Sequence, residues 1–352
     1  MPRKVSVNNR IISNKTKPYI IAEISANHNG SIKMAKDTIL AAKKTGVDAV
    51  KIQTYTPDTM TIDSKNKDFF INSGLWKNRS LYDLYKEAYT PYEWHKELFD
   101  LAKKNKITLF STPFDESAVD LLESLETPAY KVSSFELVDL PLIKYIAKTK
   151  KPIFLSTGMA KIREIREAIN TIKSQGSNKI IILHCISGYP TPIDQANLNG
   201  IKLLKKEFNF QIGLSDHTSG TLASIVAISL GASVIEKHFT ISKSIKGVDT
   251  KFSIDPIEMK TLVQDTSNAF MSLGSKNTLR SNIENYNKTF RRSIYFVRDL
   301  KKGEIITEQH IKRIRPGFGL APKYYNDIIG KKVIKNVKIG ERVTKSKISL
   351  LK

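Results

Sequence analysis

Cysteine is almost absent from the 352-residue sequence, in which Cys185 is the single one. One cysteine excludes an internal disulfide and a zinc site built on several thiolates, so any metal site needs histidine and carboxylate ligands. Long apolar runs are missing as well: no stretch reaches about 18 residues, and Met1 to Ile20 has no apolar core of a secretory signal. These absences predict a cytoplasmic protein with no membrane partner.

Acidic residues are scarce relative to basic ones, with 34 Asp and Glu against 57 Lys and Arg and a net charge of +23. Residues 291–352 carry 17 basic and 5 acidic residues, about half of this excess. Such a tail can bind nucleic acid, steer an anionic substrate or form a solvated surface. No nucleic-acid recognition motif accompanies it, so we expect no nucleic-acid partner. A basic nucleic-acid-binding protein, with steeply salt-dependent binding, is the alternative from a different class.

Short β-branched runs alternate with longer amphipathic segments, and eight strand-plus-helix units can be counted. The predicted strands are Tyr19–Glu23, Ala49–Gln53, Ile107–Thr112, Ala129–Val132, Ile153–Thr157, Lys179–His184, Gln211–Ser215 and Val234–His238. The clearest predicted helices are Ile32–Lys44, Tyr92–Lys104, Ile162–Ile172, Ile201–Phe208, Thr221–Leu230 and Pro256–Leu273. Eight such units predict an α/β fold, a (β/α)8 TIM barrel, over residues 1–275.

A doubly wound open sheet is the second interpretation, but no Gly-x-Gly-x-x-Gly follows the first strand. The polar segment 276–290 reads as a linker, and residues 291–352 as a small separate domain with short β-type runs at Ser293–Val297 and Lys332–Ile334. Thr56–Thr90, between the second and third strands, is too long for a simple loop and rich in aromatic and charged residues. Loops of this length are usually functional.

Polar or charged residues end every predicted strand. The active site of a TIM barrel lies at these carboxyl ends, so the eight ends together predict one composite site, although any single polar end also suits a solvated loop. The residues in question are Glu23, Lys51, Gln53, Thr112, Lys131, Ser134, Glu136, Ser156, Ser187, Tyr189, Ser215, His217, Glu236, Lys237, His238 and Asp249.

Lys51, Lys131 and Lys237 lie on otherwise apolar strands, where an unpaired ammonium group is costly to bury. Together with the nearby hydroxyls they suit a phosphate or a carboxylate ligand. The alternative is that these lysines form salt bridges with Glu23 or Glu136.

His217 and His238 end neighbouring strands, so their imidazoles can converge on one ion, with Glu23, Glu236 or water completing the site. The absence of accompanying cysteine favours a divalent metal such as Mn2+, Mg2+ or Co2+ over structural zinc. Each histidine taken singly also suits a buried core position or a general base.

The order of these motifs resembles the bacterial sialic acid synthases along nearly the whole chain. The motifs are Ile21 to Gly30, Lys51 to Thr54, Ser111 to Asp115, Tyr130 to Glu136, Ser156 to Met159, Tyr189 to Pro192, Gly213 to His217 and Glu236 to Thr240. In the tail, Arg291 to Ile294 and Arg315 to Gly319 resemble the small antifreeze-like (SAF, β-clip) domain that ends those enzymes.

Gly74 to Ala88, followed by Thr90 to Trp94, resembles the pseudaminic acid branch of that family. Ser187 departs from the family pattern, because the sialic acid members tend to have Asn there. The difference suits a different sugar.

The resemblance implies condensation of phosphoenolpyruvate (PEP) with an acetamido-sugar aldehyde, giving a nine-carbon 2-keto acid and phosphate. It implies that a divalent ion on His217 and His238 polarises the aldehyde, and that Glu23, or next Glu136, orients or deprotonates the attacking water. The PEP ligands are then Lys51, Lys131, Thr112, Ser134, Ser156, Ser187 and Ser215, and the sugar contacts are Gln53, Tyr189 and Asp249. Arg315 matches the tail arginine that binds the sugar in the partner subunit's barrel, which implies a domain-swapped homodimer.

Two alternatives share the barrel. A Schiff-base aldolase would use Lys131 or Lys237 as the nucleophile. A sialic or legionaminic acid synthase would keep nearly every residue named above and accept a different sugar.

Overall fold

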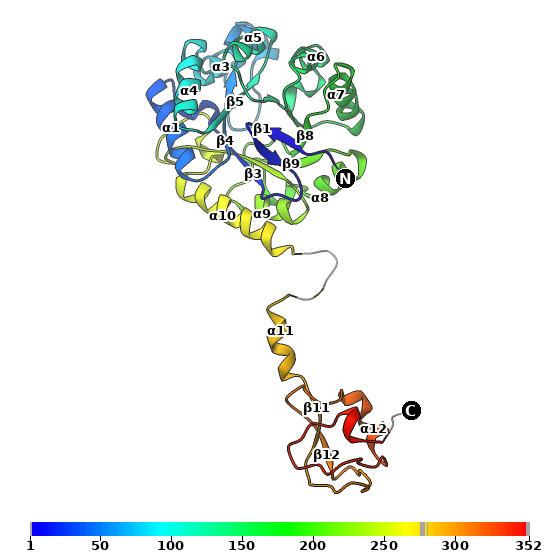
Figure 1. Ribbon diagram of the computed structural model, residues 1–352. Coiled ribbons are helices and arrows are strands. Elements are labelled where there is room, and N and C mark those ends of the chain that lie inside the picture. Colours follow the sequence, from blue (N-terminus) through cyan, green and yellow to red (C-terminus); the bar gives the residue numbers. More distant parts are fainter. Residues whose placement is uncertain (1, 275–278, 280, 350–352) are drawn as a thin grey trace. The chain divides into compact units, whose positions relative to one another are not determined.

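The computed structural model describes residues 2–274, 279 and 281–349, and the chain divides into two compact units, Met1–Gly274 and Ser275–Lys352 (Figure 1). The predicted linker, 276–290, lies partly outside the described residues. Its described part includes the short helices α11 (Glu284–Asn287) and η6 (Lys288–Phe290). We describe each unit by itself.

The first unit contains a closed barrel of parallel strands in which each strand pairs with the next along the chain and β10 pairs with β3. The strands are β3 (Tyr19–Glu23), β4 (Ala49–Thr54), β5 (Thr108–Pro113), β6 (Tyr130–Val132), β7 (Ile153–Ser156), β8 (Ile180–Cys185), β9 (Gln211–Asp216) and β10 (Val234–His238). Each bound is within one residue of the prediction. The predicted TIM barrel is therefore confirmed.

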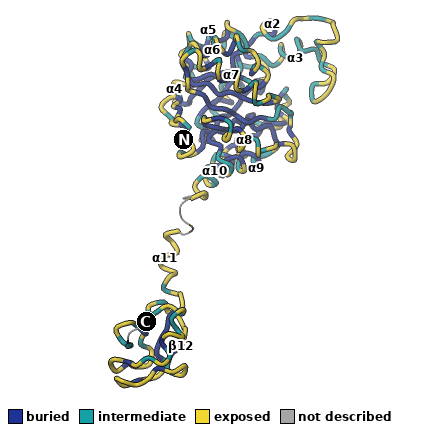
Figure 2. The backbone as a smooth tube through the Cα atoms, turned by 90° about the vertical axis from the view of Figure 1, so that its right-hand side faces the viewer, coloured by how far each residue is buried: buried dark blue, intermediate teal, exposed yellow. Residues whose placement is uncertain are grey.

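A long helix follows each barrel strand, and together the helices surround the barrel (Figure 1). They are α1 (Ile32–Lys44), α4 (Tyr92–Lys104), α5 (Glu116–Ser124), α6 (Leu140–Lys148), α7 (Ile162–Ser174), α8 (Asn199–Glu207), α9 (Leu222–Ser229) and α10 (Pro256–Ser272). Several begin at a side chain that satisfies the first backbone amides, such as Ser31 for α1, Asp115 for α5 and Asp255 for α10. Figure 2 shows buried strands inside a layer of partly exposed helices.

Apolar side chains fill the amino-terminal end of the barrel. Tyr19, Phe110 and Phe154 lie fully buried there and stack on one another. A hairpin that the sequence analysis did not predict, β1 (Val5–Val7) and β2 (Arg10–Ile12), packs against them. Since this end is closed by packed apolar groups, a site for a polar ligand is left to the carboxyl ends of the strands.

The segment between β4 and α4 is folded. It contains α2 (Pro57–Met60), η2 (Lys67–Phe69) and α3 (Leu81–Ala88). The Nε1 atom of Trp76 donates a hydrogen bond to the carbonyl oxygen of Val248 at 3.2 Å, which joins this segment to the loop after β10. The long loop predicted from the sequence is thus a folded part of the barrel unit.

The second unit is built on the antiparallel strands β11 (Ser293–Phe296) and β12 (Ile311–Ile314), with the short helix α12 (Tyr325–Ile328). Its core is apolar and includes Ile294, Phe296, Ile311, Ile328 and Val343. The predicted run Lys332–Ile334 forms isolated bridges, to Ile305 and Ile348, in place of a full strand.

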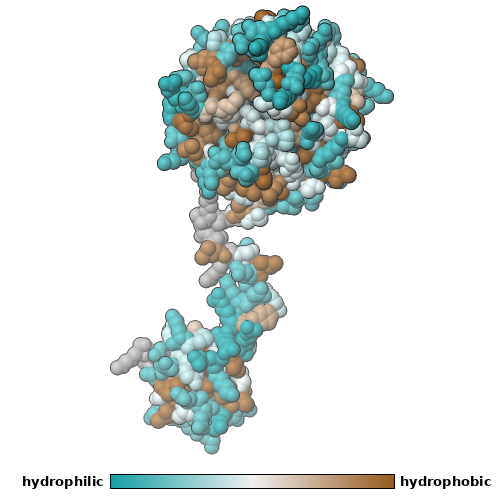
Figure 3. Space-filling model, turned by 180° about the vertical axis from the view of Figure 1, so that it is seen from behind, coloured by the Kyte–Doolittle hydropathy of each residue, from teal (hydrophilic) through white to brown (hydrophobic). Residues whose placement is uncertain are grey.

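Large apolar side chains are exposed on the outer helices of the barrel unit, among them Leu203, Leu222, Val226 and Ile257. Seen from behind, the surface of the barrel unit shows hydrophobic patches between hydrophilic groups (Figure 3). Among the described residues, no helix is long and apolar enough to cross a membrane.

Candidate active site

A cavity of about 650 Å³ opens at the carboxyl ends of the barrel strands. Its lining includes most of the residues predicted from the sequence. These are Lys51, Gln53, Lys131, Ser134, Glu136, Ser156, Ser187, Tyr189, Ser215, His217, His238 and Asp249. The structure therefore brings side chains from all parts of the barrel together in one site.

Two lysines and two glutamates form a buried cluster at the base of the cavity. Lys51 Nζ lies 2.8 Å from Glu23 Oε2 and 3.7 Å from Glu236 Oε1. Lys131 Nζ lies 3.0 Å from the same oxygen of Glu236, and Ser215 donates a hydrogen bond to it at 3.1 Å. The alternative that these lysines form salt bridges is thus confirmed for Lys51, which pairs with Glu23. Lys131 pairs with Glu236, which was not among the predicted partners.

Burial and pairing act in opposite directions on these groups. Burial disfavours the charged form of Glu236, but Lys131 and Lys51 outweigh burial and lower its pKa to about 2. Burial also raises the pKa of Glu23, and here the attraction of Lys51 is too weak to reverse the shift. Burial lowers the pKa of Lys131. Burial also disfavours the charged form of Lys51, but Glu23 and Glu236 together outweigh burial and raise its pKa. The opposite shifts in the pKa values of Glu23 and Glu236 show that the two carboxyl groups do not compensate the lysines equally.

Hydroxyl groups face this cluster across the cavity. Ser134 Oγ accepts a hydrogen bond from the backbone amide of Gly158 at 3.0 Å, and Ser156 Oγ is buried with no partner. A Cβ atom built on Gly158 would lie 2.2 Å from Ser187 Oγ and 2.7 Å from Ser134 Oγ, so glycine is required for the hydroxyls to approach. An unpartnered hydroxyl beside positive charge suits an anionic ligand that accepts hydrogen bonds.

His217 and His238 converge at the rim of this cluster, with ring centroids 5.3 Å apart. His217 Nδ1 lies 3.0 Å from the carbonyl oxygen of Ile186, so Nδ1 carries a proton and donates it. Burial disfavours the charged ring of His217, but Cys185 and this hydrogen bond outweigh burial and raise its pKa. His238 Nδ1 is buried without a partner, and burial followed by repulsion from His217 holds the pKa of His238 well below its usual range.

In its neutral form, each ring has one nitrogen lone pair available to a ligand in the cavity. Neutral imidazole is the form that binds metal. No group of three or more His, Cys, Asp and Glu side chains with metal-site geometry occurs among the described residues. A metal on this pair would therefore need water or a substrate for its remaining positions. The residues fit a divalent ion that exchanges ligands better than a closed structural site.

Two carboxyl groups were predicted for proton transfer, and the structure separates them. Glu136 lines the cavity, and burial raises its pKa to about 7. Glu23 lies below the cavity floor, where its Oε1 accepts a hydrogen bond from Gln53 at 3.2 Å and its Oε2 contacts Lys51. Glu136 has both the access and the pKa for acid–base work near neutral pH.

An apolar wall lies on the side of the cavity nearest the segment between β4 and α4. Its members are Met60, Ile71, Leu81, Leu84, Phe114 and Phe135, with the rings of Tyr55 and Tyr85 beside them. Trp76, Tyr189 and Phe252 form a second aromatic group near the histidines, with Tyr189 5.8 Å from Trp76 and 5.3 Å from Phe252 between ring centroids. The cavity is therefore polar at one end and apolar at the other.

Four predicted residues lie elsewhere. Thr112 does not line the cavity, but its Oγ1 accepts a hydrogen bond from Lys51 Nζ at 3.0 Å, which orients that lysine. Glu23 likewise acts on Lys51 from below. Lys237 points away from the cavity and pairs with Asp216 at 3.0 Å, so its place among the ligand-binding lysines was wrong. Arg315 belongs to the second unit and is exposed there.

Three cavity residues were not predicted from the sequence as substrate ligands. Glu236 was considered only as a metal ligand, yet it accepts contacts from both lysines. Cys185 Sγ lies 3.7 Å from His217 Nδ1; burial disfavours its thiolate, but His217 outweighs burial and lowers the pKa of the thiol to about 7. Ser25, at a positive φ of 48°, lines the opposite side. Strand alternation places Cys185 and Ser187 on the same face, and this signal was present in the sequence.

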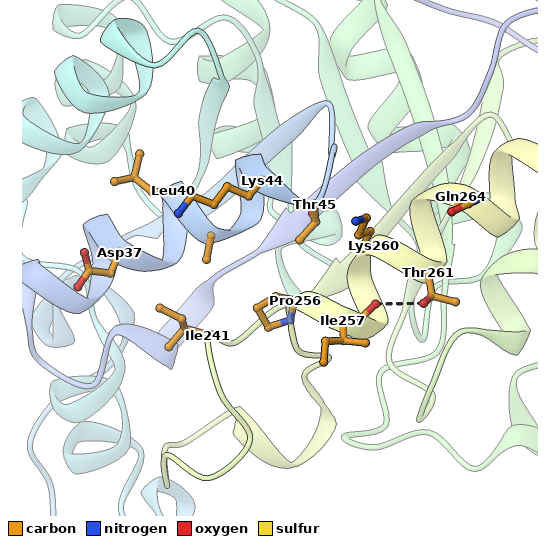
Figure 4. A pocket seen from close by; sticks show the side chains of 11 residues that line it. Asp37, Leu40, Lys44, Thr45, Ile241, Pro256, Ile257, Lys260, Thr261 and Gln264 are labelled. Carbon is orange, nitrogen blue, oxygen red and sulfur yellow. Dashed lines mark hydrogen bonds between the residues drawn. The ribbon is translucent and has the colours of Figure 1, made fainter.

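A separate hollow of about 790 Å³ lies outside the barrel between α1 and α10 (Figure 4). It is lined by Leu40 and Lys44 of α1, by Thr45 directly after that helix, and by residues of α10 that include Ile257 and Thr261. It lacks the convergent buried polar groups of the barrel cavity, which we take as the candidate active site.

Comparison with known proteins agrees with this geometry. Residues 38–278 match the NeuB family, and residues 291–349 match the SAF domain. The chain belongs to the NeuB family. The resemblance to the sialic acid synthases and the predicted SAF domain are both confirmed.

Relatives of this NeuB-family chain cover nearly its full length. It is 46% identical to a pseudaminic acid synthase of Campylobacter jejuni over 94% of this chain and 96% of the relative. It is 45% identical to a pseudaminic acid synthase of Helicobacter pylori over 91% of this chain and 95% of the relative. Among solved structures, the N-acetylneuraminic acid synthetase of Leptospira borgpetersenii, in complex with citrate, matches with a TM-score of 0.74 and 29% identity, covering 82% of this chain and 95% of that one.

Replacing Lys131 by Met tests the charge cluster of this NeuB-family protein. Removing one partner of a buried ion pair typically costs about 3–5 kcal/mol, and we expect the lower end because Glu236 keeps Lys51 and Ser215. The low pKa of Glu236 stabilises the fold above its ordinary value of 4.5, and that stabilisation fades as pH falls toward about 2. The deficit in urea unfolding should therefore be full at pH 7 and smaller at pH 4.

The matched control is Lys96→Met, which removes an exposed ion pair with Asp100. Exposed pairs of this kind contribute about 0.5 kcal/mol or less. Equal stability of Lys131→Met and the wild type at pH 7 would contradict the interpretation that Lys131 and Glu236 form a stabilising buried ion pair.

Proposed function

We propose that this protein is a pseudaminic acid synthase, which condenses PEP with 2,4-diacetamido-2,4,6-trideoxy-L-altrose to give a nine-carbon 2-keto acid and phosphate. The observation that carries the proposal is the cavity with a cationic, hydroxyl-lined end beside the histidine pair and an apolar end opposite. The names of the relatives from C. jejuni and H. pylori support the choice of sugar.

The cationic end suits PEP, which carries a phosphate and a carboxylate. Lys51 and Lys131 supply the charge, and Ser134, Ser156 and Ser187 supply donors on the facing side. The glutamates beneath hold both ammonium groups in place before the substrate binds, so little is lost in ordering them. Thr112 contributes to this end through Lys51, without touching the cavity.

Proton transfer is assigned to Glu136. The reaction adds water at C2 of the PEP unit after C3 has bonded to the sugar aldehyde, and the phosphate then leaves with cleavage of its bond to C2. The water must lose a proton, and a carboxylate whose pKa is about 7 accepts one readily near neutral pH. Glu23, which the sequence analysis preferred, serves as an electrostatic support of Lys51.

His217 and His238 are the residues that would hold a divalent ion. Mn2+, Mg2+ or Co2+ bound there would supply Lewis-acid polarisation of the aldehyde oxygen. The chain contributes the orientation of the rings: the carbonyl of Ile186 fixes the tautomer of His217, and burial keeps His238 neutral.

The apolar end suits the sugar. A 6-deoxy sugar with two acetamido groups carries three methyl groups, and an apolar wall such as that of Ile71, Leu81 and Leu84 accommodates methyl groups better than hydroxyls. Gln53, Tyr189 and Asp249 lie between the two ends and supply polar contacts.

We also propose that the second unit completes the site in a domain-swapped homodimer, with Arg315 binding the sugar of the partner's barrel and the basic tail attracting anionic substrates. The setting of the enzyme is proposed to be the cytoplasm.

A sugar panel tests the proposed substrate. Phosphate release from PEP with Mn2+ is measured with 2,4-diacetamido-2,4,6-trideoxy-L-altrose, with its legionaminic-type isomer and with N-acetylmannosamine. We expect release with the altrose sugar, because it alone combines this configuration with methyl groups for the apolar wall. Release with N-acetylmannosamine or the legionaminic-type isomer alone would keep the PEP chemistry and refute the choice of sugar.

Glu136→Gln tests the assigned base. In the wild type, kcat/KM should fall as pH drops below about 7, because protonation removes the acceptor. The variant should lose roughly 100-fold or more in kcat and should lose this acid limb. A limb that survives unchanged in Glu136→Gln would belong to the phosphate group of PEP, and the assignment to Glu136 would then be wrong.

One observation favours a second candidate, a Schiff-base aldolase. Burial lowers the pKa of Lys131, as a lysine nucleophile requires, and Lys131 faces the cavity. Lys237 does not, which removes it from this alternative. Borohydride reduction in the presence of PEP or a 2-keto acid, followed by mass spectrometry, should give no adduct on Lys131 if the chain is a PEP-condensing synthase. A reduced adduct there would establish the aldolase.

A further inference from the structure

The buried pair of Lys237 and Asp216 lies on the outer face of the barrel wall, directly behind the histidines. Lys237 is fully buried and Asp216 is 2% exposed. Their side chains approach to 3.0 Å between the strands β10 and β9, whose register sets Lys237 opposite Asp216. On the inner face the same register sets Glu236 opposite Ser215, so the two strands carry the charge cluster inside and this pair outside.

Every polar atom of the pair has a partner within this network. Asp216 Oδ1 accepts hydrogen bonds from the backbone amide and the hydroxyl of Thr218, at 2.9 and 2.7 Å. Asp216 Oδ2 accepts one from Ser224 Oγ of α9 at 2.6 Å, and Lys237 Nζ donates to the carbonyl oxygen of Thr218. The network therefore spans the backbone on both sides of His217 and joins it to the residue before His238.

We propose that Lys237 and Asp216 are positioning residues, which fix the separation and orientation of the His217 and His238 rings from behind the barrel wall. Each member of the pair immediately precedes a histidine, Asp216 before His217 and Lys237 before His238, so loss of the ion pair moves the backbone that carries the rings. The proposal gives Lys237 a role that needs no contact with a substrate. Its meaning for catalysis rests on the proposed function, in which the two rings hold a divalent ion.

The burial of the pair argues that it does more than stabilise. A fully buried ion pair is often no more stabilising than apolar residues of the same size, but it is far more demanding of geometry. Here the required geometry constrains the ends of β9 and β10. His217 directly follows the last residue of β9, and His238 is the last residue of β10. A purely apolar contact in this place would leave the strand ends free to adjust by packing alone.

The test compares Lys237→Met with Asp48→Asn in the full-length protein. Asp48 forms an ion pair with Arg10 at 2.9 Å and accepts a backbone hydrogen bond from Ile20, at the start of β3 and away from the histidines. Mn2+ is titrated without substrates and followed by electron paramagnetic resonance, and the histidine ring nitrogens are followed by 15N NMR without metal. Urea unfolding of both variants measures the structural cost.

We expect Lys237→Met to weaken Mn2+ binding roughly 10- to 100-fold, as loss of a residue that orients metal ligands typically does. It should also shift the ring resonances of His217 and His238. Asp48→Asn should lower the urea midpoint and leave both readouts unchanged. Lys237→Met with a lower urea midpoint, Mn2+ affinity within twofold of the wild type and unchanged ring resonances would overturn the proposal.

Two further arms keep the test decisive. If Lys237→Met does not fold, Ser224→Ala removes one hydrogen bond from Asp216 and should give the same two changes at smaller size; their absence in that variant counts against the proposal. If the wild type binds no Mn2+, the metal part of the proposed function fails. The ring resonances, which need no metal, then still decide whether Lys237 positions the histidines.

Discussion

The site depends on burying two ammonium groups in an apolar barrel. Lys51 and Lys131 are tolerated there because Glu236 accepts contacts from both and Glu23 supports Lys51 from below. An unpaired charge in this place would be far too costly, and two full ion pairs would leave no charge for a ligand. The structure meets both demands by sharing one carboxylate, because Glu236 Oε1 contacts both lysines while burial raises the pKa of Glu23.

The same constraint explains the division of the cavity. Charged and hydroxyl groups gather where the strands end. Most of the apolar wall comes from the segment between β4 and α4, and Phe114 and Phe135, which follow β5 and β6, complete it. In the proposed function, the barrel therefore binds PEP, and the added segment supplies most of the surface that contacts the sugar. This arrangement lets relatives in the family keep one reaction while their sugars differ.

The barrel could be predicted from the sequence because its signal is local. Each strand is a short apolar run, and every strand bound was predicted within one residue. The hairpin of Val5–Val7 and Arg10–Ile12 could not be predicted in this way, because three-residue strands with polar neighbours carry little periodicity. Its stability comes from tertiary packing against Tyr19 and Phe110, which no local pattern shows.

Individual site residues were harder to place than the site. A lysine on an apolar strand gives the same signal whether it faces the cavity or the helices, and Lys237 was therefore grouped with Lys51 and Lys131. Alternation along β10 separates them: if Glu236 and His238 face inward, Lys237 must face outward. Glu23 was the first candidate for proton transfer because the sequence does not show how deeply a residue at a strand end is buried. In the structure Glu136 lines the cavity and Glu23 does not, which favours Glu136.

Alternation also explains why one pair of strands can carry so much of the site. On β9 and β10, Ser215, His217, Glu236 and His238 share the inner face, and Asp216 and Lys237 share the outer one. A slip of one residue in either strand would exchange the faces of that strand, placing one member of the outer pair in the cavity and turning the site residues of that strand outward. A fully bonded ion pair on the outer face therefore disfavours the one error in register that would abolish the site.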